Sequence, residues 1–409
     1  SAQNGTDYAG YPIGYEDGPV VKYIEADDPS VYDQTNMYRR AMCTVETSPG
    51  KGYVADFFRV QGGSAHELSF HGGEGNVTVE GIELIPQKKG TLQGEDTEFG
   101  RRKDRKTVMF DFSLGRGNGY HYLYDVAKAE KPCGYVKLTY CIKDTWAQRT
   151  GLEGKPYLDA YFLTETDRTV IAKGQPPVNK IGNPPYLYYY LGRRQGEDLK
   201  SNFVSVYEPY IDNSEIRSVE KAPFKDAVDE FEAVCVKVTL TDGRVDYLFH
   251  SLNEETSFTV RDGLEFKGRL GFVRFKDGRI LHAFLSCGEY IKAEGKTILE
   301  ASVPAVTGYT VDFQKNPDSI NYIDVAIREN TLPKSLPDLL GRYIYIETKR
   351  PGNAVYQIQD IQSGKNGKFR IIIDETPIRG YKNGVNGKDG FSYRFEEGAA
   401  FTIPLSFSL

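Results

Sequence analysis

The stretch that decides the fold runs from Ala233 to His250. It reads Ala233-Val-Cys-Val-Lys-Val-Thr-Leu240, then Thr241-Asp242-Gly243, then Arg244-Val-Asp-Tyr-Leu-Phe-His250. Both flanks are rich in the β-branched and aromatic residues that suit a pleated strand. Asp-Gly between two such runs is a strong signal for a tight hairpin turn. The stretch therefore predicts two antiparallel strands joined by a short turn.

The same pattern recurs along the chain. Residues 270–275 and 279–285 flank Asp277-Gly278, and strand-like runs cover 53–60 and 134–142. Helical periodicity is scarce, and the composition has 29 Tyr and 22 Phe against 3 Met, with 42 Gly as turn formers. Short strands separated by turn signals are typical of antiparallel sandwiches. We predict an all-β fold.

The pattern divides the chain into two predicted domains. We expect a large, supersandwich-like antiparallel β-sandwich over residues 1–303 and a small β-module over 304–409. Thr331–Asp338 contains two prolines, which indicates a connector with at most one helical turn. In the small module, strands are predicted at residues 342–347, 355–359, 369–373 and 401–405.

Composition and motifs exclude several functions. Lys plus Arg number 51 against 57 Asp plus Glu, a net charge of −6 that argues against a dedicated nucleic-acid binder. No run approaches the roughly 18 apolar residues of a membrane span, and the polar residues 1–10 contain no signal peptide. The five cysteines have no Cys-x-x-Cys or Cys/His spacing, so no metal site is predicted. Gly-x-Ser-x-Gly and phosphate-loop signatures are absent too.

Two histidines are candidate site residues. His66 and His71 lie in a glycine-flanked run, five residues apart. This spacing places them on opposite faces of a straight strand, which disfavours a shared metal ion. His71 is either an imidazole at a ligand site or a hydrogen-bonded structural histidine.

Basic clusters suggest an anionic partner. The candidates are the pair Arg39-Arg40, the run that begins Arg101-Arg102, and the pair Arg193-Arg194. Guanidinium groups bind carboxylate and sulfate through paired hydrogen bonds, so an anionic polysaccharide is a chemically sensible ligand. The alternative is a set of solvated charges on surface loops.

The run Pro185-Tyr-Leu-Tyr-Tyr-Tyr-Leu-Gly-Arg-Arg194 adds aromatic rings beside cations. Tyr188 could stack on a sugar, or the run could be a core strand whose tyrosine hydroxyls reach the surface.

Several segments together resemble the C-terminal β-sheet region of the heparinase II/III family of polysaccharide lyases. The segments are Tyr38-Arg-Arg40, Tyr53-Val-Ala-Asp-Phe-Phe-Arg-Val-Gln-Gly-Gly63, His66-Glu-Leu-Ser-Phe-His-Gly72, Asn202-Phe-Val-Ser-Val-Tyr-Glu-Pro-Tyr210, Ile378-Arg-Gly-Tyr381 and Ala400-Phe-Thr-Ile-Pro-Leu405. Their order covers nearly the whole chain.

The resemblance implies a function and a larger architecture. Family members combine an α/α toroid, a large β-sandwich and a small β-module, and they cleave uronic-acid polysaccharides by β-elimination. Tyr and His usually supply the acid and base, and some members carry a zinc ion, for which no ligand set is visible here. The resemblance also implies a periplasmic or secreted protein. The toroid and the family's catalytic Tyr and His would lie upstream of Ser1, so no catalytic residue is assigned and we expect this chain alone to be inactive.

The candidate sugar-binding residues are therefore His71, His66, Tyr38, Arg39, Arg101, Arg102, Tyr188, Arg193 and Arg194. Two alternatives stay open. One is an active chain in which His71, Tyr38 and the arginines act on a uronate. The other is a non-catalytic carbohydrate-binding or structural module.

Overall fold

The structure is a computed structural model of the chain. It describes residues 10–100, 119–129, 131–143, 153–176, 183–349, 354–364, 367–382 and 390–409. Within these ranges the regular elements are β-strands and three short 3-10 turns, η1 (Tyr120–Tyr122), η2 (Glu329–Thr331) and η3 (Leu336–Leu339). The all-β prediction is confirmed.

The chain forms two compact units, each described here by itself. Of the described residues, the first unit comprises those within 29–219 and 240–242, and the second comprises those within 10–28, 220–239 and 243–409. Strand β14 (Ile216–Lys221) crosses the division in sequence. The predicted domain boundary between residues 303 and 304 stays a prediction.

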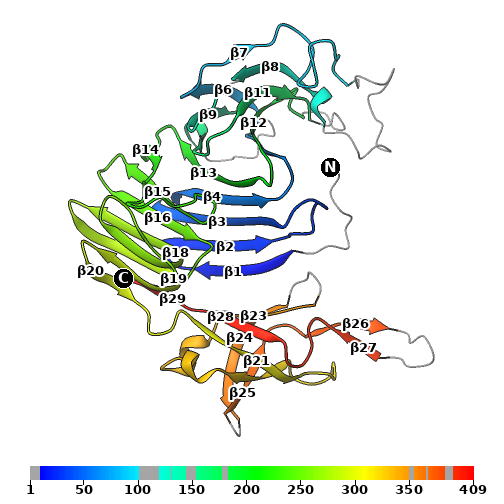
Figure 1. Cartoon of the computed structure of the whole chain (residues 1–409), viewed down its shortest axis with the longest axis vertical. Coiled ribbons are helices and arrows are strands. Elements are labelled where there is room, and N and C mark those ends of the chain that lie inside the picture. Colours follow the sequence, from blue (N-terminus) through cyan, green and yellow to red (C-terminus); the bar gives the residue numbers. More distant parts are fainter. Residues whose placement is uncertain are drawn as a thin grey trace. The chain divides into compact units, whose positions relative to one another are not determined.

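The first unit contains two antiparallel sheets (Figure 1). In one, the strands run in the order β3-β4-β13-β10-β9-β6, and in the other the order is β5-β12-β11-β8-β7. Their bounds are β3 (Met37–Ser48), β4 (Lys51–Gln61), β5 (Ala65–His71), β6 (Gly75–Glu80), β7 (Ile85–Pro86), β8 (Leu123–Ala129), β9 (Val136–Ile142), β10 (Pro156–Phe162), β11 (Arg168–Gly174), β12 (Leu187–Gln195) and β13 (Lys200–Ile211).

One hydrophobic core joins these two sheets face to face. Phe162 of β10 stacks on Tyr190 of β12, with ring centroids 3.7 Å apart and planes 6° from parallel. Phe70 of β5 stacks on Tyr207 of β13 at 4.8 Å. Burying a large apolar side chain stabilises a fold by about 1.5–3 kcal/mol. These aromatic pairs, each with one ring from either sheet, make the first unit a β-sandwich.

The second unit contains a hairpin, a sheet and a closed barrel. The hairpin is β1–β2, and the sheet has the order β15-β16-β18-β19-β20, with β17 on β18 and β29 on β19. The barrel order is β21-β22-β25-β24-β23-β28, and β26 pairs with β27. The bounds are β1 (Tyr11–Asp17), β2 (Val21–Asp27), β15 (Ala233–Leu240), β16 (Val245–Ser251), β17 (Ser257–Thr259), β18 (Leu264–Lys276), β19 (Arg279–Ala293), β20 (Lys296–Glu300), β21 (Ala305–Phe313), β22 (Tyr322–Ile327), β23 (Tyr343–Ile346), β24 (Val355–Ser363), β25 (Lys368–Ile373), β26 (Ile378–Lys382), β27 (Gly390–Tyr393), β28 (Ala400–Pro404) and β29 (Ser406–Ser408).

Long-range contacts attach β1 to the sheet of the second unit. Arg269 Nη1 donates to the carbonyl oxygen of Ile13 at 3.1 Å, across 256 residues of sequence. Ser286 Oγ donates to Glu16 Oε1 at 2.7 Å, across 270 residues. The hairpin therefore depends on strands that follow much later in the chain.

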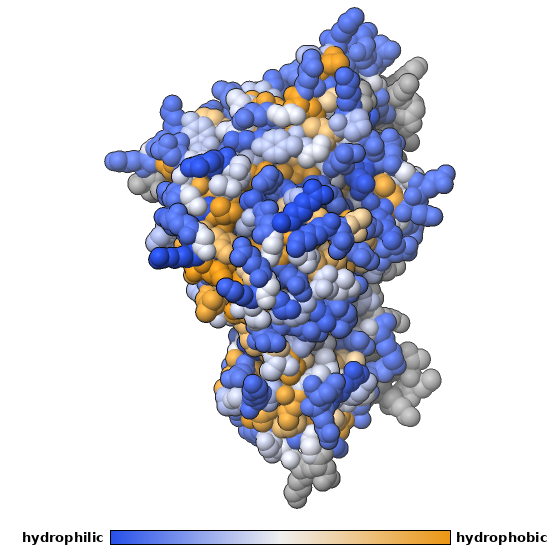
Figure 2. Space-filling view, turned by 60° about the vertical axis from the view of Figure 1, so that its left-hand side comes forward, coloured by the Kyte–Doolittle hydropathy of each residue, from blue (hydrophilic) through white to orange (hydrophobic). Residues whose placement is uncertain are grey.

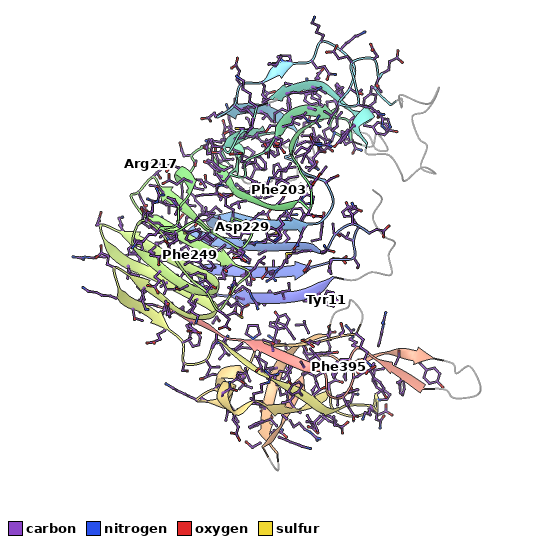
Figure 3. The ribbon with its side chains drawn as sticks, in the orientation of Figure 1. Tyr11, Phe203, Arg217, Asp229, Phe249 and Phe395 are labelled. Atoms are coloured by element: carbon purple, nitrogen blue, oxygen red, sulfur yellow. The ribbon has the colours of Figure 1, made fainter. Side chains whose placement is uncertain are left out.

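Each part of the fold has its own aromatic core. Phe203 lies in the core of the first unit, Phe249 in the sheet of the second unit and Phe395 in the barrel (Figure 3). One face of the molecule shows polar residues interspersed with smaller hydrophobic groups (Figure 2). That mixture is expected of antiparallel sheets, which alternate buried and solvated side chains.

The hairpin predicted at residues 233–250 is confirmed. β15 spans the predicted residues 233–240, and Thr239 pairs with Val245 of β16 across the turn. In the predicted connector Thr331–Asp338, η2 ends at Thr331 and η3 begins at Leu336 with Pro337 in its first turn, so the segment holds only short 3-10 turns. The sequence Thr107-Val-Met-Phe-Asp-Phe112 also alternates as a strand does, but this run lies outside the described residues.

Candidate functional site

Strand pairing brings several predicted site residues together. β5 and β12 are antiparallel neighbours, so His66 faces Arg194, Glu67 faces Arg193 and Tyr189 faces His71. Because side chains alternate along a strand, His66 and Arg194 lie on one face of the sheet while Arg193 and His71 lie on the other. The predicted placement of the two histidines on opposite faces is therefore confirmed.

A row of polar side chains crosses the face that carries Arg193. Arg193 pairs with Glu67 on one side and with Arg168 of β11 on the other. Tyr120 of η1 donates its hydroxyl proton to Glu67 Oε1 at 2.6 Å, and Arg168 Nη2 lies 4.0 Å from Glu67 Oε2. We call Glu67, Tyr120, Arg168 and Arg193 the arginine row.

The arginine row contains hydrogen-bonding groups without partners. The Nε atoms of Arg168 and Arg193 and the Oε2 atom of Glu67 are buried and have no hydrogen-bond partner in the part of the chain that the structure describes. Burying an unpaired polar group costs about 1–3 kcal/mol, and more for a charged one. Two guanidinium groups also face a single carboxylate, which leaves one positive charge in excess. The arrangement suits an anion with several acceptor oxygens.

Tyr120 remains a neutral hydrogen-bond donor in this row. Its pKa is raised to about 12, first by burial and then by the hydrogen bond to Glu67 and the charge of that carboxylate, while Arg193 and Arg168 act in the opposite direction. The side chains of Glu67 and Arg168 remain 19 % and 27 % exposed, so a ligand can contact part of each side chain. Gly119, at a φ of 76°, starts the turn that places Tyr120 here.

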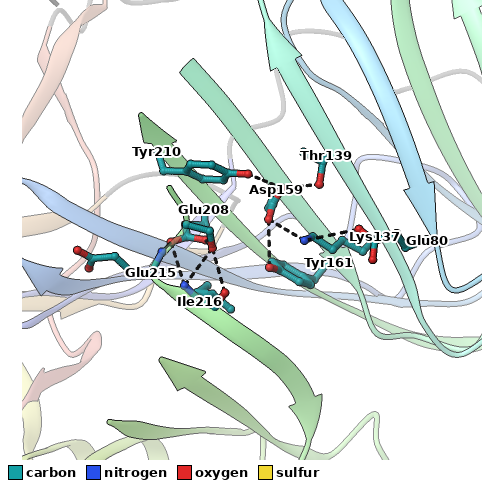
Figure 4. A network of polar contacts seen from close by, with 10 residues as sticks. Glu80, Lys137, Thr139, Asp159, Tyr161, Glu208, Tyr210, Glu215 and Ile216 are labelled. Carbon is teal, nitrogen blue, oxygen red and sulfur yellow. Dashed lines mark hydrogen bonds and ion pairs between the residues drawn. The ribbon is translucent and has the colours of Figure 1, made fainter. Parts of the chain in front are cut away.

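A second polar network in the same unit differs from the arginine row because its central carboxylate has a full set of partners (Figure 4). Asp159 of β10 is 1 % exposed and accepts from Thr139 at 2.6 Å and from Tyr161 and Tyr210 at 3.2 Å each. Lys137 Nζ lies 2.9 Å from its Oδ2 atom. Four partners satisfy this carboxylate, so the network has a structural role.

Glu208 of β13 is satisfied in the same way (Figure 4). Its Oε1 atom accepts from the backbone N–H of Glu215 at 2.7 Å and of Ile216 at 3.3 Å. Burial raises its pKa, although a hydrogen bond from Ser214 and the backbone bond from Glu215 oppose that shift. The group stabilises the turn after β13, and both of its oxygens already accept hydrogen bonds.

Other predicted residues have structural contacts. The ring of His66 donates from Nε2 to the Gly62 carbonyl at 2.7 Å and lies 2.8 Å from Ser201 Oγ through Nδ1. Burial lowers its pKa, which favours the neutral ring. Arg194 Nη1 donates to the Lys200 carbonyl at 2.8 Å. Both residues stabilise the strand ends, and neither points to the arginine row.

Tyr38, Arg39 and Tyr188 are not brought to the arginine row either. Tyr38 of β3 contacts the ring of Phe58 at 4.8 Å, and burial raises its pKa. Arg39 follows it on the opposite face of β3, where it pairs with Arg59 of β4. Tyr188 lies on the other face of β12 from Arg193, with Lys173 Nζ 5.6 Å from its ring.

Two further sequence predictions concern the basic run and metal binding. Arg101 and Arg102 lie outside the described residues. Within the described ranges there is no group of three His, Cys, Asp or Glu side chains that could hold a metal ion. The five cysteines carry free thiols.

Sequence reasoning found Arg193 but missed its partners. Glu67, Tyr120 and Arg168 are far apart in sequence and carry no motif. The pairing of β5, β12 and β11 places Glu67 and Arg168 beside Arg193, and the turn η1 adds Tyr120.

The chain was compared with known proteins. No protein-family model and no curated protein matches it. Among the described residues, no helix is long and apolar enough to cross a membrane.

Proposed function

We propose that the arginine row binds the carboxylate or sulfate groups of a uronate-containing polysaccharide. The observation that carries the proposal is the pair of buried guanidinium Nε atoms, on Arg168 and Arg193, that have no acceptor among the described residues. An arginine fork matches the two oxygens of such an anion. His71 and Tyr189 lie on the same face with ring centroids 4.9 Å apart, and their rings offer a surface for a sugar ring.

We further propose that this chain is the β region of a heparinase II/III-like lyase from a periplasmic or secreted system. The sequence resemblance supports this step, and the sandwich of the first unit is compatible with it. β-Elimination needs a base for the C5 proton and an acid for the leaving oxygen. We assign neither role to a residue of this chain, so the proposal makes turnover dependent on an α/α toroid.

A polysaccharide panel tests both parts. Heparan sulfate, chondroitin sulfate, hyaluronan and alginate are each titrated into the protein by calorimetry, and ultraviolet absorbance reports any unsaturated uronate product. We expect at least one to bind, with an affinity that falls as salt rises, and none to give product. Product formation would contradict the dependence on the toroid. Failure of all four to bind would contradict the role of the arginine row.

The pH dependence of binding separates arginine from histidine recognition. Between about pH 6 and pH 9 the guanidinium groups stay charged, and Tyr120, with a pKa of about 12, stays neutral. We therefore expect a constant affinity across this range, measured by calorimetry at fixed ionic strength. A site that depended on a protonated histidine would lose affinity as the pH rose through this range, and such a loss would rule against the arginine row.

A further inference from the structure

A cavity in the second unit carries an inference beyond the proposed function. It has a volume of about 430 Å³, within the range of ligand pockets. β1 contributes Tyr15 and Glu16, and β23 contributes Tyr343 and Tyr345. Ile344 and Ile346 of β23 lie in the barrel core, so the alternating Tyr343 and Tyr345 point outward.

Two tyrosine rings form one wall of this cavity. Tyr15 is 43 % exposed, and its ring lies 5.1 Å from that of Tyr343 at an angle of 71°. An exposed aromatic ring is an apolar surface with a polar hydroxyl at its edge. Such a surface is suited to the C–H face of a pyranose ring.

Two further polar groups line the cavity, and only one of them has a hydrogen-bond partner among the described residues. Glu16 Oε1 accepts from Ser286 at 2.7 Å. The hydroxyl of Tyr345 is buried and has no hydrogen-bond partner among the described residues. Glu16 is close enough to Tyr345 to raise the pKa of its phenol, after the larger effect of burial.

The cation beside the cavity already has acceptors. Arg342 donates from Nε to the Asp338 carbonyl at 2.8 Å, from Nη1 to Ser406 Oγ at 3.1 Å and from Nη2 to the Ser406 carbonyl at 3.2 Å. All three of its guanidinium nitrogens donate hydrogen bonds, whereas the Nε atoms of Arg168 and Arg193 have no acceptor among the described residues. Together with the carboxylates of Glu16 and Asp17 in the lining, this disfavours an anionic ligand.

We propose that the cavity binds a pyranose unit of a neutral saccharide. A sugar hydroxyl is both donor and acceptor, so it can accept from Tyr345 and donate to Glu16. Tyr15 and Tyr343 then contact the ring. Burial raises the pKa of Glu16 despite hydrogen bonds from Ser406 and Ser286. The inference depends on residues of the second unit alone and stands apart from the arginine row.

Saturation-transfer NMR and calorimetry on the full chain test this site. The probes are cellopentaose, xylopentaose, mannopentaose, laminaripentaose and chitopentaose. We expect one or more to bind. Tyr345→Phe removes one neutral hydrogen bond and should weaken binding about 3- to 10-fold. Tyr343→Ala removes an aromatic contact and should weaken it by about tenfold or more.

Matched variants distinguish this site from others. Tyr309 of β21 is 43 % exposed, the same fraction as Tyr15, but does not line the cavity. Tyr309→Ala should therefore leave binding unchanged while Tyr15→Ala weakens it, and Arg193→Ala should have no effect on the neutral probes. Thermal melting checks that each variant is folded. Absence of binding by all five probes, or binding that survives both Tyr343→Ala and Tyr345→Phe, would overturn the proposal without touching the proposed function.

Discussion

Replacing Arg193 by alanine lowers the affinity for the anionic polysaccharide by roughly 10- to 100-fold, the expected loss for one or more hydrogen bonds to a charged group. The melting temperature of the Arg193→Ala variant stays unchanged or rises slightly, because the buried Nε atom of Arg193 has no acceptor among the described residues. Arg193→Lys keeps the charge but loses the planar fork, so we expect an intermediate affinity. Calorimetric titration and thermal melting measure both effects.

Arg217 supplies the matched control for this prediction. It is an exposed arginine of the first unit, and its Nη2 atom donates to the Thr241 carbonyl at 2.8 Å (Figure 3). Arg217→Ala removes the same charge from the same unit, so it reports the non-specific electrostatic contribution. Equal losses in the two variants would mean that net charge, and not the arginine row, attracts the polysaccharide. A large fall in melting temperature for Arg193→Ala would assign that residue a structural role.

Asp246→Ala destabilises the second unit by about 3–5 kcal/mol, the usual effect of removing one partner of a buried ion pair. Asp246 is 0 % exposed and pairs with Arg274 across β16 and β18. Arg274 donates to its two oxygens at 2.7 and 2.8 Å. Without Asp246 the buried guanidinium loses both bonds, and the free energy of unfolding in urea should fall accordingly.

The double variant Asp246→Leu/Arg274→Met distinguishes the loss of the ion pair from the cost of leaving one buried charge unpaired. It removes both charges and fills the space with apolar groups, so it should cost clearly less than Asp246→Ala alone. If the free energy of unfolding of Asp246→Ala lies within about 1 kcal/mol of that of the original chain, the Arg274 guanidinium finds other acceptors and the prediction fails. Parallel urea titrations of all three proteins give the comparison.

The sequence carries much of the fold because local and global signals agree. In Ala233–His250 the strand formers, the Asp-Gly turn and the burial pattern all favour one hairpin, and β15 and β16 follow it closely. Phe162 and Tyr190 also lie in runs that are rich in aromatic residues, which is typical of core strands. What could not be predicted is which partner a strand takes when the two are not neighbours in a hairpin.

The candidate site depends on that missing information. Glu67 and Arg168 are 101 residues apart in sequence, and they meet only because β12 pairs with β5 on one side and with β11 on the other. Tyr38 and His66 are plausible site residues from the sequence. In the structure, Tyr38 packs on Phe58 and His66 hydrogen-bonds to the Gly62 carbonyl, so neither lies in the arginine row. A one-residue change of register would reverse the outcome, since it moves every side chain to the opposite face.

The long-range attachment of β1 has a consequence for synthesis. Glu16 and Ile13 leave the ribosome more than 250 residues before Ser286 and Arg269, their partners in the second unit. At about 5–20 residues per second, this early segment waits on the order of 10 to 50 s for those partners. During that interval its strand edges are open to pairing with other chains. Expression at low temperature or with a holding chaperone should therefore improve the yield of correctly assembled protein.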